Sequence, residues 1–305
     1  MQKEINLKRD RKIAAFKEML PSYLMLAPFL IFFVLFLVLP ILCSIVFSFT
    51  NFDMINTPKF IGLENYIRMF LDDDVFPTVF KNTLVFAIIC GPVGFLLAFV
   101  LAWFINEFSP IIRTILSFMF YCPGLVGGAV FIWQVAFSSD SYGYMNSALL
   151  SLGVITEPIA WLSTEDYIQP IVIIVQLWMS MGVSFLTNIS GLQNVNQELY
   201  EAGSIDGIRN RWQELWYITL PTMKHMLLFS AVMQISSAFS IGAIAVQLAG
   251  YPSVGYAADT IVTHMSDLGS VRFEMGYASA IATVLFILTL GSNKVINTLL
   301  KKVGN

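Results

Sequence analysis

Charged residues are scarce in this chain of 305 residues: only 12% are Asp, Glu, Lys or Arg, whereas 57% are hydrophobic. Soluble domains carry roughly a quarter of their residues as charges, so the composition excludes an ordinary soluble domain. The apolar residues gather in runs of about 20 or more, the length at which a helix crosses the ~30 Å hydrocarbon layer of a membrane. The chain is therefore predicted to be an all-helical integral membrane protein.

Residues that carry chemistry are also few. The three cysteines, Cys43, Cys90 and Cys122, are widely spaced within apolar runs, which indicates buried hydrophobes rather than disulfides or a metal site. The sequence has no G-x-x-x-x-G-K-[ST] phosphate-binding loop, no cluster of metal ligands and no Ser/His/Asp grouping. We therefore predict no catalytic residue, no metal and no cofactor in this chain, and no binding of nucleic acid.

Six apolar runs are long enough to span a membrane as helices, because an open strand edge in lipid would leave backbone groups unpaired. They are residues 24–49, 83–105, 112–136, 169–189, 222–248 and 275–298. Residues 1–23 are predicted to be a cytoplasmic interfacial segment, with Ile13, Phe16 and Leu20 on one helical face. Residues 299–305 form a cytoplasmic tail.

The positive charges indicate the orientation. Of the 17 Lys and Arg residues, 13 fall in the two terminal segments and in the connections after the second and fourth runs. Only 4 fall in the other three connections. By the positive-inside rule, both termini are predicted to be cytoplasmic. The acidic and aromatic connections 50–82 and 137–168 are then external.

The cytoplasmic connection between the fourth and fifth runs, residues 192–221, is predicted to form two short helices. The first carries apolar residues at helical spacing and ends at Gly207, where a left-handed conformation is expected; these residues are Leu192, Val195, Leu199, Ala202 and Ile205. The second begins at Asn210, with Gln213 completing a capping box, and stops at Pro221. Its apolar face holds Trp212, Leu215 and Trp216. The pattern favours a surface that a partner grips; the alternative is an amphipathic loop on the bilayer.

This connection resembles a known family. Glu201-Ala202-Gly203, Asp206-Gly207 and the "ITLP" that ends at Pro221 look like the EAA signature of the membrane subunits of bacterial ABC importers. The third residue of that signature is usually alanine, and here it is Gly203. Four further stretches resemble the carbohydrate-uptake branch and its maltose-type first permease subgroup: "FIGLENYIRMF", "RTILSFMFYCPGLVGGAVFIWQVAF", "YGYMNSALLSLG" and "GYASAIATVLFILTL".

The resemblance implies a type I ABC importer permease fold in the bacterial inner membrane. It implies a coupling helix that docks on an ATP-binding subunit, with an ionic contact at Glu201 and a close turn at Gly207. The expected coupling residues are Glu201, Ala202, Gly203, Asp206, Gly207, Arg209, Trp212, Leu220 and Pro221. ATP and Mg would be held by that partner. A second homologous permease, an extracellular solute-binding protein and a sugar or oligosaccharide complete the expected assembly.

Uncharged polar side chains line one side of the fourth and fifth runs. They are Gln176, Ser180, Ser184 and Thr187 in the fourth and Ser230, Gln234, Ser237, Ser240 and Gln247 in the fifth. Trp178 is a further candidate for stacking on a sugar ring. Such stripes suit the passage of a neutral, hydroxyl-rich solute, but the same residue types also hydrogen-bond helix to helix in membranes.

Two other functions remain open at this point. A secondary transporter or channel would need ionisable residues or interrupted helices at membrane depth, and the apolar runs show no sign of either. A membrane enzyme would need a catalytic constellation, which the sequence lacks.

Overall fold

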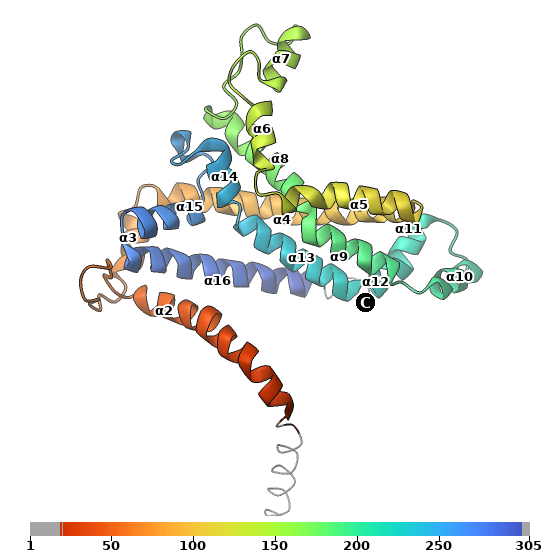
Figure 1. Ribbon diagram of the computed structural model, residues 1–305, viewed down its shortest axis with the longest axis horizontal. Coiled ribbons are helices and arrows are strands. Elements are labelled where there is room, and N and C mark those ends of the chain that lie inside the picture. Colours follow the sequence, from red (N-terminus) through yellow and green to blue (C-terminus); the bar gives the residue numbers. More distant parts are fainter. Residues whose placement is uncertain (1–18, 20, 301–305) are drawn as a thin grey trace, which may run out of the picture.

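The computed structural model describes residue 19 and residues 21–300 of the chain (Figure 1). Within these residues the chain forms helices and loops, with no β-pairing beyond an isolated bridge between Thr50 and Phe60. The predicted all-helical architecture is confirmed. The predicted interfacial face of Ile13, Phe16 and Leu20 lies outside the described residues, as do residues 301–305 of the tail.

Three helices of the described chain are long and apolar enough to cross a membrane. The first, Pro21–Phe47, includes the π-helical segment η1 (Val34–Val38) and α2 (Leu39–Phe47). The second is α4 (Phe76–Asn106), which continues through Pro92 without a break. The third is most of α16 (Met275–Leu300).

The other three predicted runs are interrupted, so the expectation of continuous spans is wrong for them. Each is a pair of helices: α5 (Pro110–Leu125) and α6 (Val130–Ala136) at 86°, α8 (Glu165–Met179) and α9 (Met181–Gln193) at 40°, and α13 (Lys224–Phe239) and α14 (Gly242–Ala249) at 42°. The sharpest bend falls at the flexible Gly127-Gly128 pair. Six spans result only if each bent pair counts as one.

The connections hold shorter helices. Those near the beginning of α4 and α16 are α3 (Glu64–Leu71), η3 (Val254–Tyr256), α15 (Ile261–Ser266) and η4 (Asp267–Val271), and α7 (Tyr144–Ser151) follows α6. Between α9 and α13 lie α10 (Gln197–Ile205), α11 (Arg211–Glu214), η2 (Leu215–Thr219) and α12 (Leu220–Thr222). Figure 1 shows α3 and α10 at opposite ends of the bundle.

The helix α4 is the centre of the packing. It lies against both α9 and α13 and supplies side chains to all three apolar clusters of the described chain. Phe86 belongs to the cluster with α8 and α14, Phe99 to the cluster with α9 and η2, and Val79 to the cluster with α15 and α16. Its buried residues recur every three or four positions along one stripe of the helix, so α4 packs with one face against several helices and leaves side chains such as Ile88 and Leu96 exposed on the other.

The first span stands apart from this bundle. The most apolar 18-residue window of Pro21–Phe47 contains no buried residue, and the helix leaves the bundle from its contact between α2 and α16 (Figure 1). Cys43 is consequently exposed, whereas Cys90 is buried and Cys122 is half-buried. The prediction of buried cysteines is therefore wrong for Cys43, because its helix lies outside the core.

Candidate functional site

The first helix of the predicted coupling segment is α10. It begins later than expected, because Asn196 adopts an extended conformation and its side chain accepts a hydrogen bond from the backbone N–H of Glu198. Leu192 therefore belongs to α9, and Val195 lies in the break between the two helices. The single helix predicted from Leu192 to Ile205 is wrong at its beginning.

The end of α10 is as predicted. Gly207 has φ +98°, a left-handed conformation that glycine adopts at little cost. Its N–H donates to the carbonyl of Ser204 at 3.4 Å, and the N–H of Ile208 donates to the carbonyl of Gly203 at 2.9 Å. These two bonds form a Schellman motif, which pairs the last carbonyls of the helix and fixes the direction of the following chain.

The second helix begins at Asn210, as predicted. The Asn210 side chain accepts from the Gln213 N–H at 2.9 Å, and the Gln213 side chain accepts from the N–H of Arg209 at 2.9 Å. In a capping box the Gln213 side chain would accept from the N–H of Asn210 itself, whereas here it accepts from the preceding residue. The predicted apolar face divides: Leu215 is buried, whereas Trp212 and Trp216 are 68% and 64% exposed.

Pro221 does not stop this helix, which is a correction to the sequence-based expectation. In the π-helical turn η2 the N–H of Leu220 bonds to the carbonyl of Leu215, five residues back. This shift of hydrogen-bond register places Pro221 among the first residues of α12, where a missing N–H is tolerated. The helix stops two residues later, at Met223.

The predicted coupling residues separate into an exposed and a packed group. The exposed residues are Glu201, Ala202, Asp206, Gly207, Arg209 and Trp212, while Gly203 is buried and Leu220 and Pro221 are half-buried. Ile205, on the apolar face predicted for the first helix, is 86% exposed. A strongly exposed isoleucine and tryptophan among charged side chains form a surface suited to a protein partner.

Gly203 lies where α10 approaches η2 closely. A Cβ atom at this position would lie 2.6 Å from Cδ1 of Ile218 in η2. A second contact between the same elements is the hydrogen bond between the hydroxyls of Tyr200 and Thr219, at 2.9 Å. The two short helices are therefore held together, and they present their exposed groups as one surface, which we call the coupling surface.

Most of the predicted passage residues join helices. Gln176 donates to the hydroxyl of Ser237 at 3.1 Å, and Gln234 donates to the hydroxyl of Ser180 at 2.7 Å. Ser184 and Ser230 each donate to the other's backbone carbonyl, at 3.1 and 3.3 Å. These bonds connect the bent α8–α9 span to α13, which is the helix-bonding role that the sequence left open.

Part of the same set also lines a cavity of about 330 Å³ between α5, α9 and α13. Ser180, Ser184, Gln234 and Ser237 are among its lining residues. The carbonyl oxygen Oε1 of Gln234 is buried and has no hydrogen-bond partner among the described residues. Tyr121, Met179 and Met233 also line this cavity. They were not predicted, because an aromatic residue or a methionine in an apolar run gives no polar signal.

The remaining predicted passage residues lie elsewhere. Thr187 and Ser240 donate to the carbonyls of Val183 and Ser236 within their own helices. Trp178 packs edge-on against Trp133, with ring centroids 5.6 Å apart. Gln176 lies beside the cavity through its bond to Ser237 but does not line it.

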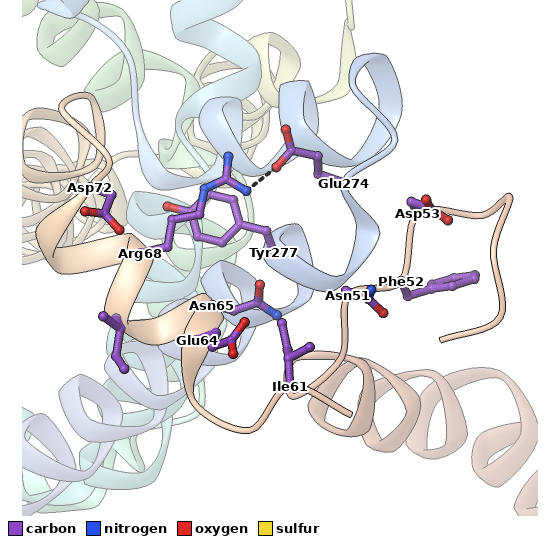
Figure 2. Close-up of a pocket in the computed structure, with 11 residues that line it drawn as sticks. Asn51, Phe52, Asp53, Ile61, Glu64, Asn65, Arg68, Asp72, Glu274 and Tyr277 are labelled. Carbon is purple, nitrogen blue, oxygen red and sulfur yellow. Dashed lines mark hydrogen bonds and ion pairs between the residues drawn. The ribbon is translucent and has the colours of Figure 1, made fainter. Parts of the chain in front are cut away.

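At the opposite end of the bundle from α10, a second cavity of about 580 Å³ lies between the 51–61 loop, α3 and α16 (Figure 2). Arg68 on its wall pairs with Glu274 at 2.5 Å, and its guanidinium lies 4.2 Å from the centre of the Tyr277 ring. Tyr277 in turn donates to Asp73 at 2.5 Å. The network joins α3 to the first turn of α16.

Asp73 connects this network to α4. One carboxylate oxygen faces Nε2 of His264 at 2.8 Å, and the other accepts from the backbone N–H groups of Val75 and Phe76 at the start of α4. Burial opposes ionisation of Asp73, but the hydrogen bonds from Tyr277 and His264 outweigh it and hold the pKa of the carboxyl below its ordinary value.

Comparison with known proteins agrees with this architecture. The family described as "Binding-protein-dependent transport system inner membrane component" matches residues 91–301. The chain is similar to the probable ABC transporter permease protein YesP of Bacillus subtilis, with 32% identity covering 92% of this chain and 90% of the relative. It is also similar to the arabinooligosaccharides transport system permease protein AraP of the same organism, with 32% identity covering 88% and 84%.

A solved structure shows the same fold. The bacterial alginate ABC transporter in complex with an alginate pentasaccharide-bound periplasmic protein contains a chain that superposes with a TM-score of 0.78. The sequences are 23% identical, and the match covers 96% of this chain and 98% of the other. The resemblance that the EAA-like segment carries is thereby confirmed: this chain belongs to the inner membrane components of binding-protein-dependent transport systems, and it is an ABC transporter permease rather than an enzyme.

Proposed function

We propose that this chain is the permease of an ATP-driven importer that carries a sugar or oligosaccharide, received from an external solute-binding protein, through a passage shared with a second permease. The observation that carries this proposal is the coupling surface on α10 and α11. There Ile205 and Trp212 are exposed beside Glu201 and Arg209, on two helices fixed to each other by the Schellman turn and the Gly203 contact. A rigid, exposed surface that carries both apolar and charged side chains is what an ATP-binding subunit needs in order to move the permease.

The nature of the solute is supported by the relatives and by the small cavity. AraP is named for arabinooligosaccharides, and the solved transporter is named for alginate. In this chain the cavity is lined by Ser180, Ser184, Ser237 and Gln234, and the buried side-chain carbonyl of Gln234 has no hydrogen-bond partner among the described residues. Uncharged donors and acceptors among apolar residues suit a solute that is rich in hydroxyl groups.

The orientation follows from the distribution of positive charge. With 13 of 17 Lys and Arg residues on one side, the termini and the coupling surface face the cytoplasm. The Asp73 network and the loop that carries α7 then face outward, where the binding protein delivers the solute. ATP and Mg belong to the partner subunit, since this sequence has no phosphate-binding loop.

The second permease accounts for apolar surface that this chain cannot bury alone. The first span has no buried residue in its most apolar window, and α5 exposes Ile111, Ile115, Phe118 and Met119. In the assembled importer, the second permease and lipid cover these faces.

A secondary transporter is the alternative, and the bent spans bear on it. A secondary transporter is expected to have interrupted helices, and three spans of this chain are interrupted, so this criterion does not exclude that function. The charge criterion still argues against it, because among the described residues no buried Asp, Glu, Lys, Arg or His lies within a span. Energy therefore has to enter from a partner, which agrees with the family.

The test uses the complex reconstituted in liposomes with its ATP-binding subunit and binding protein. Glu201→Lys and Gly207→Val should each abolish ATP-driven uptake and weaken co-purification of the ATP-binding subunit, because one reverses the contact charge and the other forbids the left-handed turn. Glu157→Lys, the same charge change in an exposed external residue, is the matched control and should leave co-purification intact. Normal uptake in both coupling variants contradicts the proposal. Stimulation of ATP hydrolysis across a panel of solutes, each with the binding protein, identifies the sugar.

A further inference from the structure

The cytoplasmic end of α4 is tied to the coupling segment by two contacts that the sequence did not suggest. Nη2 of Arg211 in α11 lies 2.6 Å from Oε2 of Glu107, the residue that ends α4. The ring of Trp212 lies 5.1 Å from the ring of Trp103, centroid to centroid, one turn earlier on α4. Two neighbouring residues of α11 thus each contact a residue of α4 that lies more than 100 positions away in the sequence.

Buried packing lies beside these surface contacts. Ala102 and Ile105 of α4 share one apolar cluster with Leu215 and Ile218 of η2, and all four are less than 10% exposed. An exposed ion pair such as Glu107–Arg211 adds little to folding stability. Its geometric effect is different: together with the ring pair it ties the end of α4 to α11, beside the apolar cluster to which both α4 and η2 contribute.

From this end α4 runs as one helix of 31 residues to the opposite end of the bundle, and Pro92 near its middle removes a single hydrogen bond from its backbone ladder. There Asn82 donates to the backbone carbonyls of Tyr256 and Asp259 at 2.8 and 3.1 Å, and the hydroxyl of Thr83 accepts from the N–H of Ile261. At ~1.5 Å per residue, about 36 Å separate Thr83 from Glu107. Halfway along, the carbonyl of Cys90 accepts from Gln234, a residue of the cavity wall.

The contrast with the neighbouring helices is mechanical. The spans α5–α6, α8–α9 and α13–α14 each consist of two helices that meet at an angle of 40° or more, and a displacement is absorbed where the two helices meet. A span that continues as one helix transmits a displacement of one end to the other. In this chain α4 alone, of the helices attached to η2 and α11, reaches the loop at 250–261 without such a bend.

We propose that α4 and the second coupling helix move as one body and that α4 carries the displacement of the coupling surface to the cavity at Gln234 and to the 250–261 loop. Glu107, Arg211, Trp103 and Trp212 are the positioning residues of this connection. The inference rests on the proposed coupling function, which supplies the displacement, and it adds the route by which that displacement reaches the passage.

The first experiment reverses the ion pair in the reconstituted complex. Glu107→Arg and Arg211→Glu should each lower solute uptake per ATP hydrolysed at least fivefold while the ATP-binding subunit still co-purifies. The double variant, with the charges exchanged, should return to within twofold of the wild type. Glu214→Gln is the control: it removes the other partner of Arg211, at 3.0 Å within the same helix, and keeps the bond to α4. Its uptake should be unchanged.

Three results overturn the inference: single variants within twofold of the wild type, a double variant no better than the singles, or loss of the ATP-binding subunit from Arg211→Glu that the exchange does not restore. The last result would place Arg211 in the docking interface itself. Failure of the coupling function is distinguished by Glu201→Lys, which must lose the ATP-binding subunit if that function is correct.

A cross-link tests the single-body motion directly. Glu107→Cys and Arg211→Cys are introduced with Cys43→Ser, because Cys43 is the exposed native thiol, and are joined by a short flexible bis-thiosulfonate. Since the two helices keep their relative position, the cross-linked complex should retain at least half of its uptake. Abolished uptake after cross-linking, restored by reduction, would show that the helices must separate and would refute the inference.

Discussion

The most sensitive point in the packing of α4 is Gly94. A Cβ atom placed there would lie 2.0 Å from Nε2 of Gln234, whereas Cβ atoms in real structures essentially never approach another heavy atom closer than 3.0 Å. In Gly94→Ala the amide of Gln234 therefore has to move by about an ångström. That movement breaks its hydrogen bonds to the hydroxyl of Ser180, at 2.7 Å, and to the carbonyl of Cys90, at 3.3 Å.

The size of the effect follows from these two bonds. A hydrogen bond between membrane helices is worth about 0.6 kcal/mol on average, and a buried amide left without partners costs about 1–3 kcal/mol more. Alanine is a better helix former than glycine, which adds back about 1 kcal/mol to the free energy of unfolding. We expect a net loss of about 1–3 kcal/mol in the free energy of unfolding, which corresponds to a fall of several degrees in melting temperature.

Gly91→Ala is the matched control, one turn earlier on the same helix. Its Cβ would meet only Cγ1 of Ile235, at 3.8 Å, which is an ordinary contact. The assay is thermal unfolding of the purified complex in detergent, followed by tryptophan fluorescence. Gly94→Ala should melt several degrees below the wild type and Gly91→Ala at or slightly above it. Equal melting temperatures in the two variants would refute the reasoning.

Three further predictions concern the coupling surface, the outer network and the cavity. Gly203→Ala should keep the ATP-binding subunit, because only the mobile Cδ1 atoms of Ile218 and Ile208 have to yield, whereas Gly203→Leu should lose it on co-purification. Because the pKa of Asp73 is lowered in the folded protein, its ionised form stabilises the fold above about pH 4, and this contribution disappears as the pH falls through the lowered pKa. Asp73→Asn should therefore show a smaller acid-induced drop in melting temperature than the wild type. An equal drop in the two proteins would contradict this prediction. Gln234→Leu should change the relative uptake of a panel of sugars, because Gln234 lines the cavity. Gln176→Leu alters a helix contact outside the cavity and should change stability alone. The same sugar profile in both variants would show that Gln234 only packs between helices.

The sequence was sufficient wherever a local rule acts on a few neighbouring residues. The apolar runs predicted helices because a membrane leaves the backbone no other way to pair its polar groups. The left-handed turn at Gly207 and the cap at Asn210 were predictable because each depends on a single residue and its nearest backbone. The family signature was readable for the same reason.

Predictions from local patterns failed at three places. Pro221 was read as a stop, but the π-helical turn before it provides a place for the missing N–H. The run 112–136 was read as one span, although a bend of 86° divides it. Polarity alone could not separate Gln234, which lines the cavity, from Ser240, which bonds within its own helix, because both positions carry the same signal.

The amino-acid sequence by itself determined that this protein is a helical membrane permease, and it predicts which segment faces the energy source, since hydrophobic length, charge bias and a contiguous motif are all one-dimensional properties. Only the tertiary structure decided which polar residues bond helices and which line a cavity. It also revealed the ties from α4 to Arg211 and Trp212, residues more than 100 positions away in the sequence. Such contacts depend on how helices cross, and crossing geometry is set by packing among all of them together.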